Sequence, residues 1–394
     1  MSERKILSRG FVLTFFSQFS LSSVSQTLMT TLPLYLSSLR ATEVEIGLLV
    51  GSLSVTSLVF RPFIGRLLLK IPEKRFMMGG SLLVALSSAS YLIAPPFWPF
   101  LFVRIVQGVG LASFNTATVT FIANIAPESR RGQSMGYFFL SFNLALAISP
   151  ACGMFVVNRF GFVILFIICT ILSLSSLFIA SRLESTRPPA PEEASAESDL
   201  QITNRIFAPT FMYFLSHLTW GALTAFFPLY AVRQGVSNPG LFFAAYAAVL
   251  ILCRSLGGRI IDSYSREKIL LPCLGAYVIG MTTLAFSKTL PMFLAVAVIT
   301  AAGHAFLMPS LMSYAIELAG VSRGPAMGII TAIGDLGIGV GPMLMGIILR
   351  LTNFPVMFLS VATVSLINFL YFYRLAKRSC GSDSKTLDVR PQTE

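Results

Sequence analysis

Two parts of the chain repeat one pattern of residues, and this duplication constrains the possible folds more than any other feature. Residues 104–153 read RIVQGVG, an apolar run, PESRRGQSMG and a second apolar run ending in SPACG, and residues 303–346 follow the same plan. The matched pairs are Gly110 and Gly303, Arg131 and Arg323, Gly132 and Gly324, Met135 and Met327, Pro150 and Pro342, and, upstream, Arg61 and Arg254. Their nearly constant offset predicts two homologous halves.

The composition places these halves in a membrane. Of the 394 residues, 55% are hydrophobic and only 12% are charged, whereas about 25% of a soluble protein is charged. Apolar runs of about 18 or more residues recur along the chain as far as residue 373, which indicates a polytopic helical membrane protein. Duplicated halves in such a chain are typical of a transporter whose site lies between them.

The basic residues predict the orientation of the chain. The net charge is +12, and most of the 29 Lys and Arg fall in loops on one side of the expected spans. The loops of the other side carry Arg40, Arg159, Arg233, Lys288 and Arg350. Because basic loops stay in the cytoplasm, both termini are expected there, in a multi-pass protein of the cytoplasmic (inner) membrane. The scattered charge excludes a nucleic-acid-binding patch.

The apolar runs predict an all-α integral membrane protein with twelve transmembrane helices in two pseudo-symmetric six-helix bundles. The expected spans are 11–38, 46–66, 76–95, 99–124, 134–157, 162–181, 206–231, 240–261, 269–287, 291–318, 325–349 and 355–375. We divide the chain into an N-terminal bundle (1–181), a cytoplasmic linker (182–205), a C-terminal bundle (206–375) and a cytoplasmic tail (376–394). The linker's Pro, Ser, Ala and acidic residues predict disorder.

Ionisable side chains distinguish lining helices from peripheral ones. The third expected span of each triplet contains none apart from Tyr and Cys. The other spans carry Arg61, Arg104, His217, Arg254, His304, Glu317 and Asp335. Such groups are costly in lipid and normally face protein or water. The spans that carry them are therefore expected to line an interior.

The sequence contains no usable pattern for a metal, a nucleotide or a catalytic nucleophile. Its five Cys show no CxxC spacing, and no P-loop, HExxH or GxSxG occurs in a usable context. We therefore expect no metal, no cofactor and no enzymatic activity, and a gradient as the energy source. The linker and tail are too short and polar for the soluble domain of a transporter-derived sensor.

Two loops carry copies of a motif that joins the second and third spans of a known transporter family. The second copy contains Gly258, Arg259, Asp262, Arg266 and Lys268; in the first copy Gly65 and Arg66 remain, and Leu69 occupies the Asp position. With this motif and those below, the chain resembles the major facilitator superfamily, most closely its bacterial proton-driven exporters. The resemblance implies that Asp262 latches a helix N-terminus. The alternative is that the basic residues of both loops only set the orientation of the chain in the membrane.

A second motif of the family lies on the fourth span. Arg104, Gln107, Gly108 and Gly110 form R-x-x-Q-G-x-G. Arg104 cannot readily lose its proton, but it can hold a fixed positive field or pair with an anionic substrate, so the resemblance implies a coupling role. The alternative is a structural Arg that donates to backbone carbonyls and fixes helix packing.

A third motif resembles one found in drug:proton exporters. The fifth span contains Ser149, Pro150 and Gly153, and the eleventh span contains the stronger copy, with Gly337, Gly341, Pro342 and Gly346. Small residues at this spacing let helices approach closely, and Pro frees a backbone carbonyl and bends the helix. A hinge between the halves and ordinary close packing remain the two interpretations.

Asp335 is the most informative single residue. It lies ten residues after Pro325, roughly 15 Å along a helix and near the midplane, where transporter sites lie. Its repeat partner, Asn143, has a similar depth on the fifth span. A carboxyl there can exchange a proton, and His304 would titrate with it if the two approach each other. A protonated Asp bonded to a neighbouring helix is the alternative.

The remaining candidates are cavity residues and charges near the helix ends. The further cavity candidates are Gln18, Gln26, Gln107, Asn115, His217 and Tyr246. Arg61 and Arg254 are interpreted first as side chains that reach toward the membrane interface, with a gate contact second. Glu317, near an inner helix end, is expected to pair with a loop Arg.

Together these features predict a secondary transporter that exports a small molecule in exchange for protons by alternating access. A proton-coupled symporter or a facilitator for uptake of a small nutrient is the alternative. The expected partners are a small-molecule substrate, protons and the lipid bilayer, with no nucleic acid, and the fold can act as a monomer.

Overall fold

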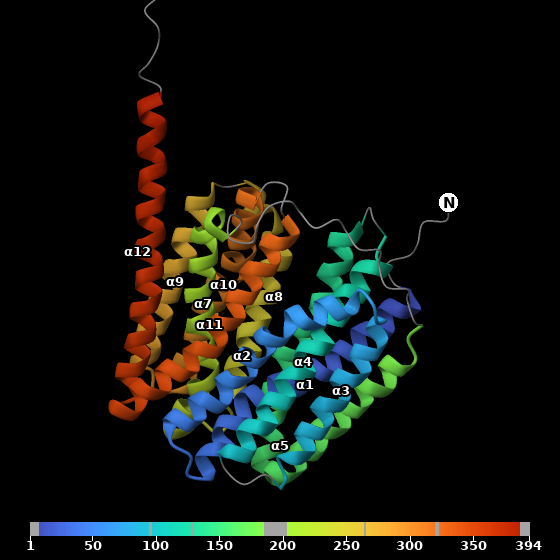
Figure 1. Cartoon of the computed structure of the whole chain (residues 1–394). Helices are drawn as coiled ribbons and strands as arrows, with labels where there is room; N and C mark the ends of the chain where they lie inside the picture. The colour runs from blue at the N-terminus through green and yellow to red at the C-terminus, as the bar shows by residue number, and fades with distance from the viewer. Residues whose placement is uncertain are drawn as a thin grey trace, which may run out of the picture.

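The fold is known from a computed structural model that describes residues 8–93, 97–127, 130–184, 203–263, 265–319 and 323–386. Side chains are described throughout these ranges except at 131–132, 256–263, 323–325 and 378–386. Within the described ranges, helices are the only regular secondary structure. They form two bundles side by side (Figure 1), an N-terminal half and a C-terminal half.

The helices follow the expected spans closely. The N-terminal half consists of α1 (Arg9–Ser38), α2 (Glu43–Leu68), α3 (Glu73–Ser90), α4 (Trp98–Ile125) and α5 (Arg131–Ser181). The C-terminal half consists of α7 (Phe207–Arg233), α8 (Gly240–Ser263), α9 (Arg266–Phe286), α10 (Leu290–Ala319), α11 (Arg323–Leu351) and α12 (Phe354–Thr386). We call the end of the bundle where α1 begins and α12 ends the termini end, and the opposite end the distal end.

The long element α5 is two helical segments. Gly161 within it has φ 82° and ψ 176°, which are not helical values. A positive φ is accessible to Gly without the steric cost that a Cβ brings. The chain therefore breaks at this residue, between the expected fifth (134–157) and sixth (162–181) spans, and the described part of each half has six helical segments.

The last helix is longer than expected. The sequence predicts a span ending near 375 and a loose tail after Arg374, whereas α12 continues to Thr386. No Pro interrupts residues 374–386, so nothing in the backbone stops the helix where its apolar part ends. The expected linker and tail otherwise fall largely on residues 185–202 and 387–394, which lie outside the described residues.

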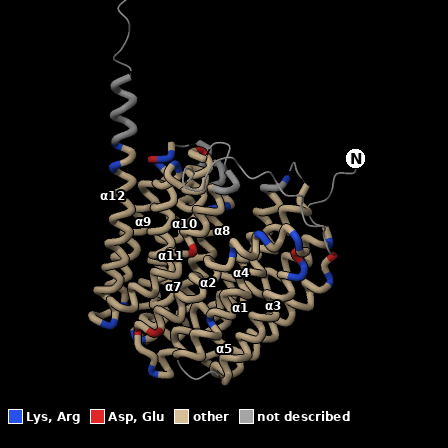
Figure 2. Tube along the Cα trace, in the orientation of Figure 1, with Lys and Arg blue, Asp and Glu red and all other residues tan. Residues whose placement is uncertain are grey.

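Apolar length and charge position both fit a membrane protein. In the described part of the chain, seven helices are long and apolar enough to cross a membrane: those that include 43–68, 98–125, 133–181, 266–286, 290–319, 326–351 and 354–377. Lys, Arg, Asp and Glu gather mainly at the two ends of the helices (Figure 2). Two helices outside this set, α1 and α7, bury many Ser and Thr side chains, which lowers their hydropathy without exposing them.

At the termini end, each half has a side-chain contact at the same repeat positions, formed by a hydrogen bond in one half and by an ion pair in the other. In the N-terminal half, Asn124 Nδ2 at the end of α4 donates to Glu73 Oε1 at the start of α3, over 2.6 Å. In the C-terminal half, the residues at the matching repeat positions are Glu317 and Arg266, and they form an ion pair. This pair confirms the expectation that Glu317 contacts a loop Arg.

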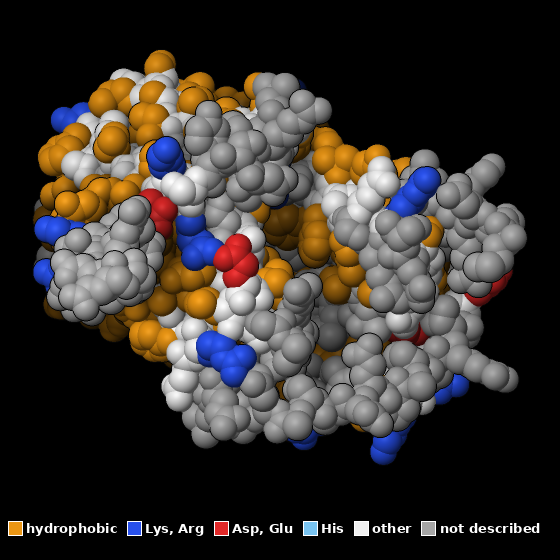
Figure 3. All heavy atoms as spheres, turned by 90° about the horizontal axis from the view of Figure 1, so that it is seen from above, with side chains coloured by type: hydrophobic (Ala, Val, Ile, Leu, Met, Phe, Trp, Pro, Cys, Tyr) orange, Lys and Arg blue, Asp and Glu red, His pale blue; other side chains and the backbone are white. Residues whose placement is uncertain are grey.

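The two halves meet at the distal end along a seam between α2 and α11. Its backbones pass so closely that a Cβ on Gly47 would lie 3.0 Å from the Pro342 carbonyl carbon, and one on Gly51 would overlap the Gly339 carbonyl oxygen. A second seam joins α5 to α8, where Asn238 Nδ2 donates to Ala151 O over 3.3 Å. From the termini end, the surface is hollowed between the halves (Figure 3).

Small residues cover two faces of α11. Gly337 and Gly341 face α7, where a Cβ on Gly337 would lie 2.6 Å from Phe214 O. Gly339 and Gly346 face α2, where a Cβ on Gly346 would lie 2.6 Å from Glu43 O. The expected close approach of the third motif therefore occurs within the C-terminal half and between the halves at once.

We predict that Gly51→Ala opens the distal seam, because its methyl group overlaps Gly339 O in this conformation. Met343 packs at the same place, with Cγ 3.0 Å from a Cβ on Gly51. In a protein with Met343→Cys and the native cysteines replaced, a maleimide should react faster once Gly51→Ala is added. Gly79 has open space around it, so Gly79→Ala is the control. Equal rates in both variants would contradict the seam.

Candidate functional site

An ion pair between Arg61 and Asp335 joins the two halves. Arg61 Nη1 of α2 contacts Asp335 Oδ2 of α11, and the two side chains are 32% and 20% exposed. Along α11, Asp335 follows the α2-facing residues Gly346, Pro342 and Gly339 toward the termini end. The pair therefore lies on the hollow's side of these glycine contacts, and its partial exposure lets water reach it.

This partner differs from the expected one. The sequence suggests His304 as the partner of Asp335 and treats Arg61 mainly as an interface residue, whereas the structure brings Asp335 to Arg61. The glycines of α11 pack against α2 and α7, and in this orientation of the helix about its axis Asp335 faces α2. The signal was present in the sequence, since Arg61 and Asp335 are opposite charges on two expected lining helices.

His304 belongs to a separate aromatic cluster within the C-terminal half, formed by Trp220, Tyr246, Tyr277 and His304. The Tyr246 hydroxyl and His304 Nδ1 form a hydrogen bond. The Trp220 ring centroid lies 4.8 Å from that of Tyr246 and 5.5 Å from that of His304. Trp220 and Tyr277 were not singled out from sequence, because aromatic residues in lipid-facing positions look the same.

The other histidine, His217, contacts its own helix. Its Nδ1 lies 2.9 Å from Tyr213 O, and its ring lies 4.0 Å from the Tyr213 ring, centroid to centroid. A Cβ on Gly337 would lie 3.1 Å from His217 Cβ. His217 therefore packs at the junction of α7 and α11, next to the helix that carries Asp335.

Arg104 is held by oxygen atoms of the N-terminal half. Its Nε donates to Leu49 O over 2.8 Å, Nη2 to Val50 O over 3.2 Å and Nη1 to Gln107 Oε1 over 2.7 Å. The Tyr91 hydroxyl donates to the same Gln107 oxygen over 2.6 Å. Arg104 is 6% exposed, so this geometry matches the structural interpretation, in which the guanidinium ties α4 to α2.

The two glycines of the same motif allow close packing inside the half. A Cβ on Gly108 would lie 2.8 Å from Thr56 Cβ of α2, and one on Gly110 would lie 2.9 Å from Gly80 O of α3. Both positions therefore fix α4 against its neighbours.

Amide side chains line the N-terminal half. Gln18 Nε2 donates to Ser22 Oγ over 2.8 Å and to Asn115 Oδ1 over 3.3 Å, which links α1 to α4. The Oε1 atoms of Gln18 and Gln26 are buried and accept no hydrogen bond within the described residues. Asn143 is half-buried on α5. The structure thus brings Gln18 to Asn115, and it leaves two buried amide oxygens without a hydrogen-bond donor among the described residues.

The motif residues of the loops are only partly described. The side chains of Gly258, Arg259 and Asp262 lie outside the described residues, so the latch stays a prediction. Arg266 pairs with Glu317, and its Cζ lies 3.9 Å from the Tyr314 ring centroid.

Five further motif residues lie partly at the surface and partly in helix contacts. Arg66 and Lys268 are exposed, and Gly65 has open space around it. In the third motif, a Cβ on Gly153 would lie 2.6 Å from Thr27 Cγ2 of α1. Pro150 lies at the α5–α8 seam, where a Cβ on Gly240 would lie 2.5 Å from the neighbouring Ala151 Cα.

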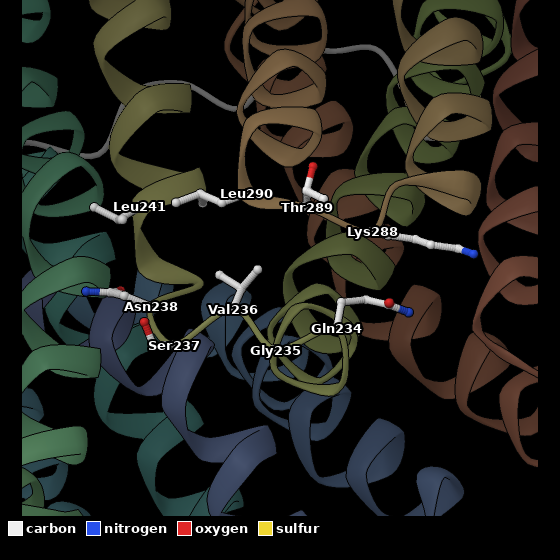
Figure 4. A pocket seen from close by; sticks show the side chains of 9 residues that line it. All are labelled: Gln234, Gly235, Val236, Ser237, Asn238, Leu241, Lys288, Thr289 and Leu290. Atoms are coloured by element: carbon white, nitrogen blue, oxygen red, sulfur yellow. The ribbon is translucent and has the colours of Figure 1, made fainter.

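A small pocket of about 300 Å³ lies at the connections between α7 and α8 and between α9 and α10 (Figure 4). It is lined by Gln234, Gly235, Val236, Ser237, Asn238, Leu241, Lys288, Thr289 and Leu290. The Lys288 side chain points away from the other lining residues. None of the residues predicted to form the site lines this pocket, and we assign it no role.

Comparison with known proteins identifies the family. The family model described as Major Facilitator Superfamily matches residues 14–239 and 209–389, which is most of the chain. The Staphylopine export protein of Staphylococcus aureus is 25% identical over 355 residues, which cover 86% of this chain and 88% of that protein. Multidrug resistance protein 2 of Bacillus subtilis is 22% identical over 349 residues, which cover 84% and 86%.

Solved structures share the fold at low identity. The nucleoside transporter NupG matches with a TM-score of 0.76 and 14% identity, over 93% of this chain and 99% of that chain. A bacterial homologue of the human lysosomal transporter Spinster, in an inward-facing and unoccupied conformation, matches with a TM-score of 0.74 and 14% identity, over 94% and 97%.

We predict that Arg104→Lys destabilises the protein without removing its transport chemistry. Lys cannot reach the two α2 carbonyls and Gln107 together, and unsatisfied buried acceptors cost about 2 kcal/mol. The thermal unfolding midpoint in detergent should fall, whereas the exposed Arg66→Lys should leave it unchanged. Normal stability with lost transport would instead support a coupling role for Arg104.

Proposed function

Because the chain belongs to the major facilitator superfamily, we propose that it exports a small molecule across the membrane in exchange for protons. All twelve helical segments then span the bilayer of a cytoplasmic membrane, and the termini end, with its basic loops, faces the cytoplasm. The hollow seen from that end is the cytoplasmic opening, and the distal seam closes the outer side. We retain the four-part division of the chain and a monomer as proposals.

The observation that carries this proposal is the ion pair between Arg61 and Asp335. It joins the two halves, whose relative movement is the basis of alternating access. It also contains the one carboxyl expected near the membrane midplane, and it is partly open to water. A proton that binds Asp335 removes the negative charge and with it the ion pair.

This arrangement suits an exchanger. In an exchanger, a conformational change of the empty, unprotonated carrier dissipates the proton gradient without transport of substrate. The empty, unprotonated carrier must therefore be kept in one conformation. The Arg61–Asp335 pair provides such a hold in the conformation described here. Protonation of Asp335 breaks the ion pair and permits the protonated carrier to change conformation. A bound substrate must replace the free energy of the lost ion pair with that of its own contacts.

The strength of the pair is sufficient for control. A partly exposed ion pair contributes about 1 kcal/mol, and an energy of that size changes a two-state equilibrium about fivefold. If the two charges lose water while the halves move, the free energy that the ion pair contributes increases. The pair therefore biases the equilibrium without trapping the carrier permanently, and a protonation event or a ligand can reverse the bias.

The direction of transport rests on the family members that this chain resembles. Two of them are described as an export protein and a multidrug resistance protein, and the Pro-containing exporter motif recurs at both seams. We assign Asp335 as the proton site and Arg61 as its counter-ion. Gln18, Gln26, Asn115 and Asn143 form the neutral wall of the substrate cavity, and the aromatic cluster of His304 forms part of the opposite wall.

We predict that Asp335→Asn abolishes proton movement that is evoked by substrate, because the amide cannot carry the proton. Purified protein is placed in proteoliposomes with a trapped pH-sensitive dye and an imposed proton gradient. A pool of small amphiphilic compounds of both charge signs is then added. Opposite movement of substrate and proton identifies exchange, and movement in the same direction identifies the symport alternative.

The matched control removes a carboxylate elsewhere. Glu317 pairs with Arg266 at the termini end and is not in the interior, so Glu317→Gln should retain the flux. Unchanged flux in Asp335→Asn would refute the assignment of the proton site. Substrate movement without proton flux in the wild type would show a facilitator.

A further inference from the structure

The Arg61–Asp335 pair has a counterpart in the internal repeat, and that counterpart has an amide at the position of the acid. Arg61 on α2 matches Arg254 on α8, and Asp335 on α11 matches Asn143 on α5. The helices α2 and α11 form one seam between the halves, and α8 and α5 form the other. The second seam has therefore kept the arginine while its carboxylate position is a neutral amide.

The surroundings of Arg254 leave its charge without an acidic partner. Within the described residues, no Asp or Glu lies in ion-pair distance of it. Its Nε makes one long contact of 3.5 Å to Ala305 O, and the residue is exposed. Arg104, the other interior arginine with no acidic partner, is by contrast buried against three oxygen acceptors.

Arg254 faces the same interior as the ion pair. Tyr213 lies within electrostatic range of Arg254, Arg61 and Asp335 together. Tyr246 and Tyr277 of the aromatic cluster also lie within electrostatic range of Arg254. The contact of Arg254 Nε with Ala305 O, the residue after His304, places the guanidinium beside the part of α10 that carries the imidazole of the aromatic cluster.

The cluster beside Arg254 presents a partly open aromatic surface. Trp220 and His304 are half-buried, whereas Tyr246 and Tyr277 behind them are buried. The Trp220 and Tyr246 rings are 36° from coplanar, and the bond from Tyr246 to His304 fixes the imidazole. Trp and His rings at the open edge can contact a planar group of a ligand.

From this arrangement we infer that Arg254 and Trp220 bind a small organic anion that has a planar or aromatic part. The guanidinium offers paired donors that fit a carboxylate or a phosphate, and the indole contacts the ring. An arginine charge that is enclosed without a partner is costly, so an anion on Arg254 lowers the cost of closing the halves. That this anion is the transported substrate rests on the proposed function.

The test uses Trp220 as its own reporter. The chain has two Trp residues, and Trp98 is 73% exposed on α4, so Trp98→Phe leaves Trp220 as the single indole. Four probes share one quenching ring: para-nitrobenzoate, para-nitrophenyl phosphate, the neutral para-nitrobenzamide and the cationic para-nitrobenzylamine. Each is titrated into the purified full-length protein in detergent, and the saturable quenching of Trp220 fluorescence is recorded.

We expect at least one of the two anions to bind about tenfold more tightly than the amide, which corresponds to one charge-assisted contact. Comparison of the two anions separates a carboxylate site from a phosphate site. Arg254→Gln should remove this preference and Arg254→Lys should keep part of it. Arg159→Gln, which removes an exposed charge at the distal end, should leave it intact.

Three results would overturn the anion site. They are equal or tighter binding of the amide or the amine, no saturable quenching by either anion, and an anion affinity that Arg254→Gln does not change. Binding is measured without a proton gradient, so it is independent of coupling. If proton exchange is refuted but anion affinity still depends on Arg254, the anion site holds. If proton exchange is observed but anion affinity does not depend on Arg254, only the exchange proposal holds.

Discussion

Arg61 and Asp335 lie on different halves of a chain whose surface is mostly apolar, and each charge is costly there without the other. Their contact ties α2 to α11, and we propose that the described conformation depends on it. The hold can be removed by one proton. In the proposed mechanism the structural ion pair and the proton site are therefore the same two side chains, and their charge sets the balance between conformations.

The ion pair is possible only because the helices around it approach closely. Gly51 and Gly339 allow the backbones of α2 and α11 to touch, and Gly337 and Gly341 allow α11 to lie against α7. Side chains larger than hydrogen at these positions would separate the helices and rotate Asp335 away from Arg61. Close packing by small residues is a major source of helix association in lipid, so the seam and the charge site depend on the same residues.

The sequence was sufficient for what depends on depth along a helix, and insufficient for what depends on rotation about it. Apolar runs, the repeat and the turn at Gly161 predicted the helices, and residue counting placed Asp335 among lining positions. The partner of Asp335 depends on which way α11 faces across the two halves, which no periodicity within one span reveals. Arg104 illustrates the same limit, since only the structure distinguishes a guanidinium bonded to carbonyls from one that faces a ligand.

The two halves differ in charge at their seams: one seam holds a closed ion pair, and in the other the repeat position of the acid is the amide of Asn143. The central claim, that the pair holds the described conformation, is tested most directly by the distance between the halves at the distal end. Spin labels at Arg159, which is exposed on α5 beside the break at Gly161, and at Lys288, which is exposed between α9 and α10, report it by pulsed electron resonance in lipid nanodiscs. We predict that Asp335→Asn shifts the population toward longer distances, and that Arg61→Asp combined with Asp335→Arg restores the short distance. Identical distributions in the wild type and Asp335→Asn would contradict it.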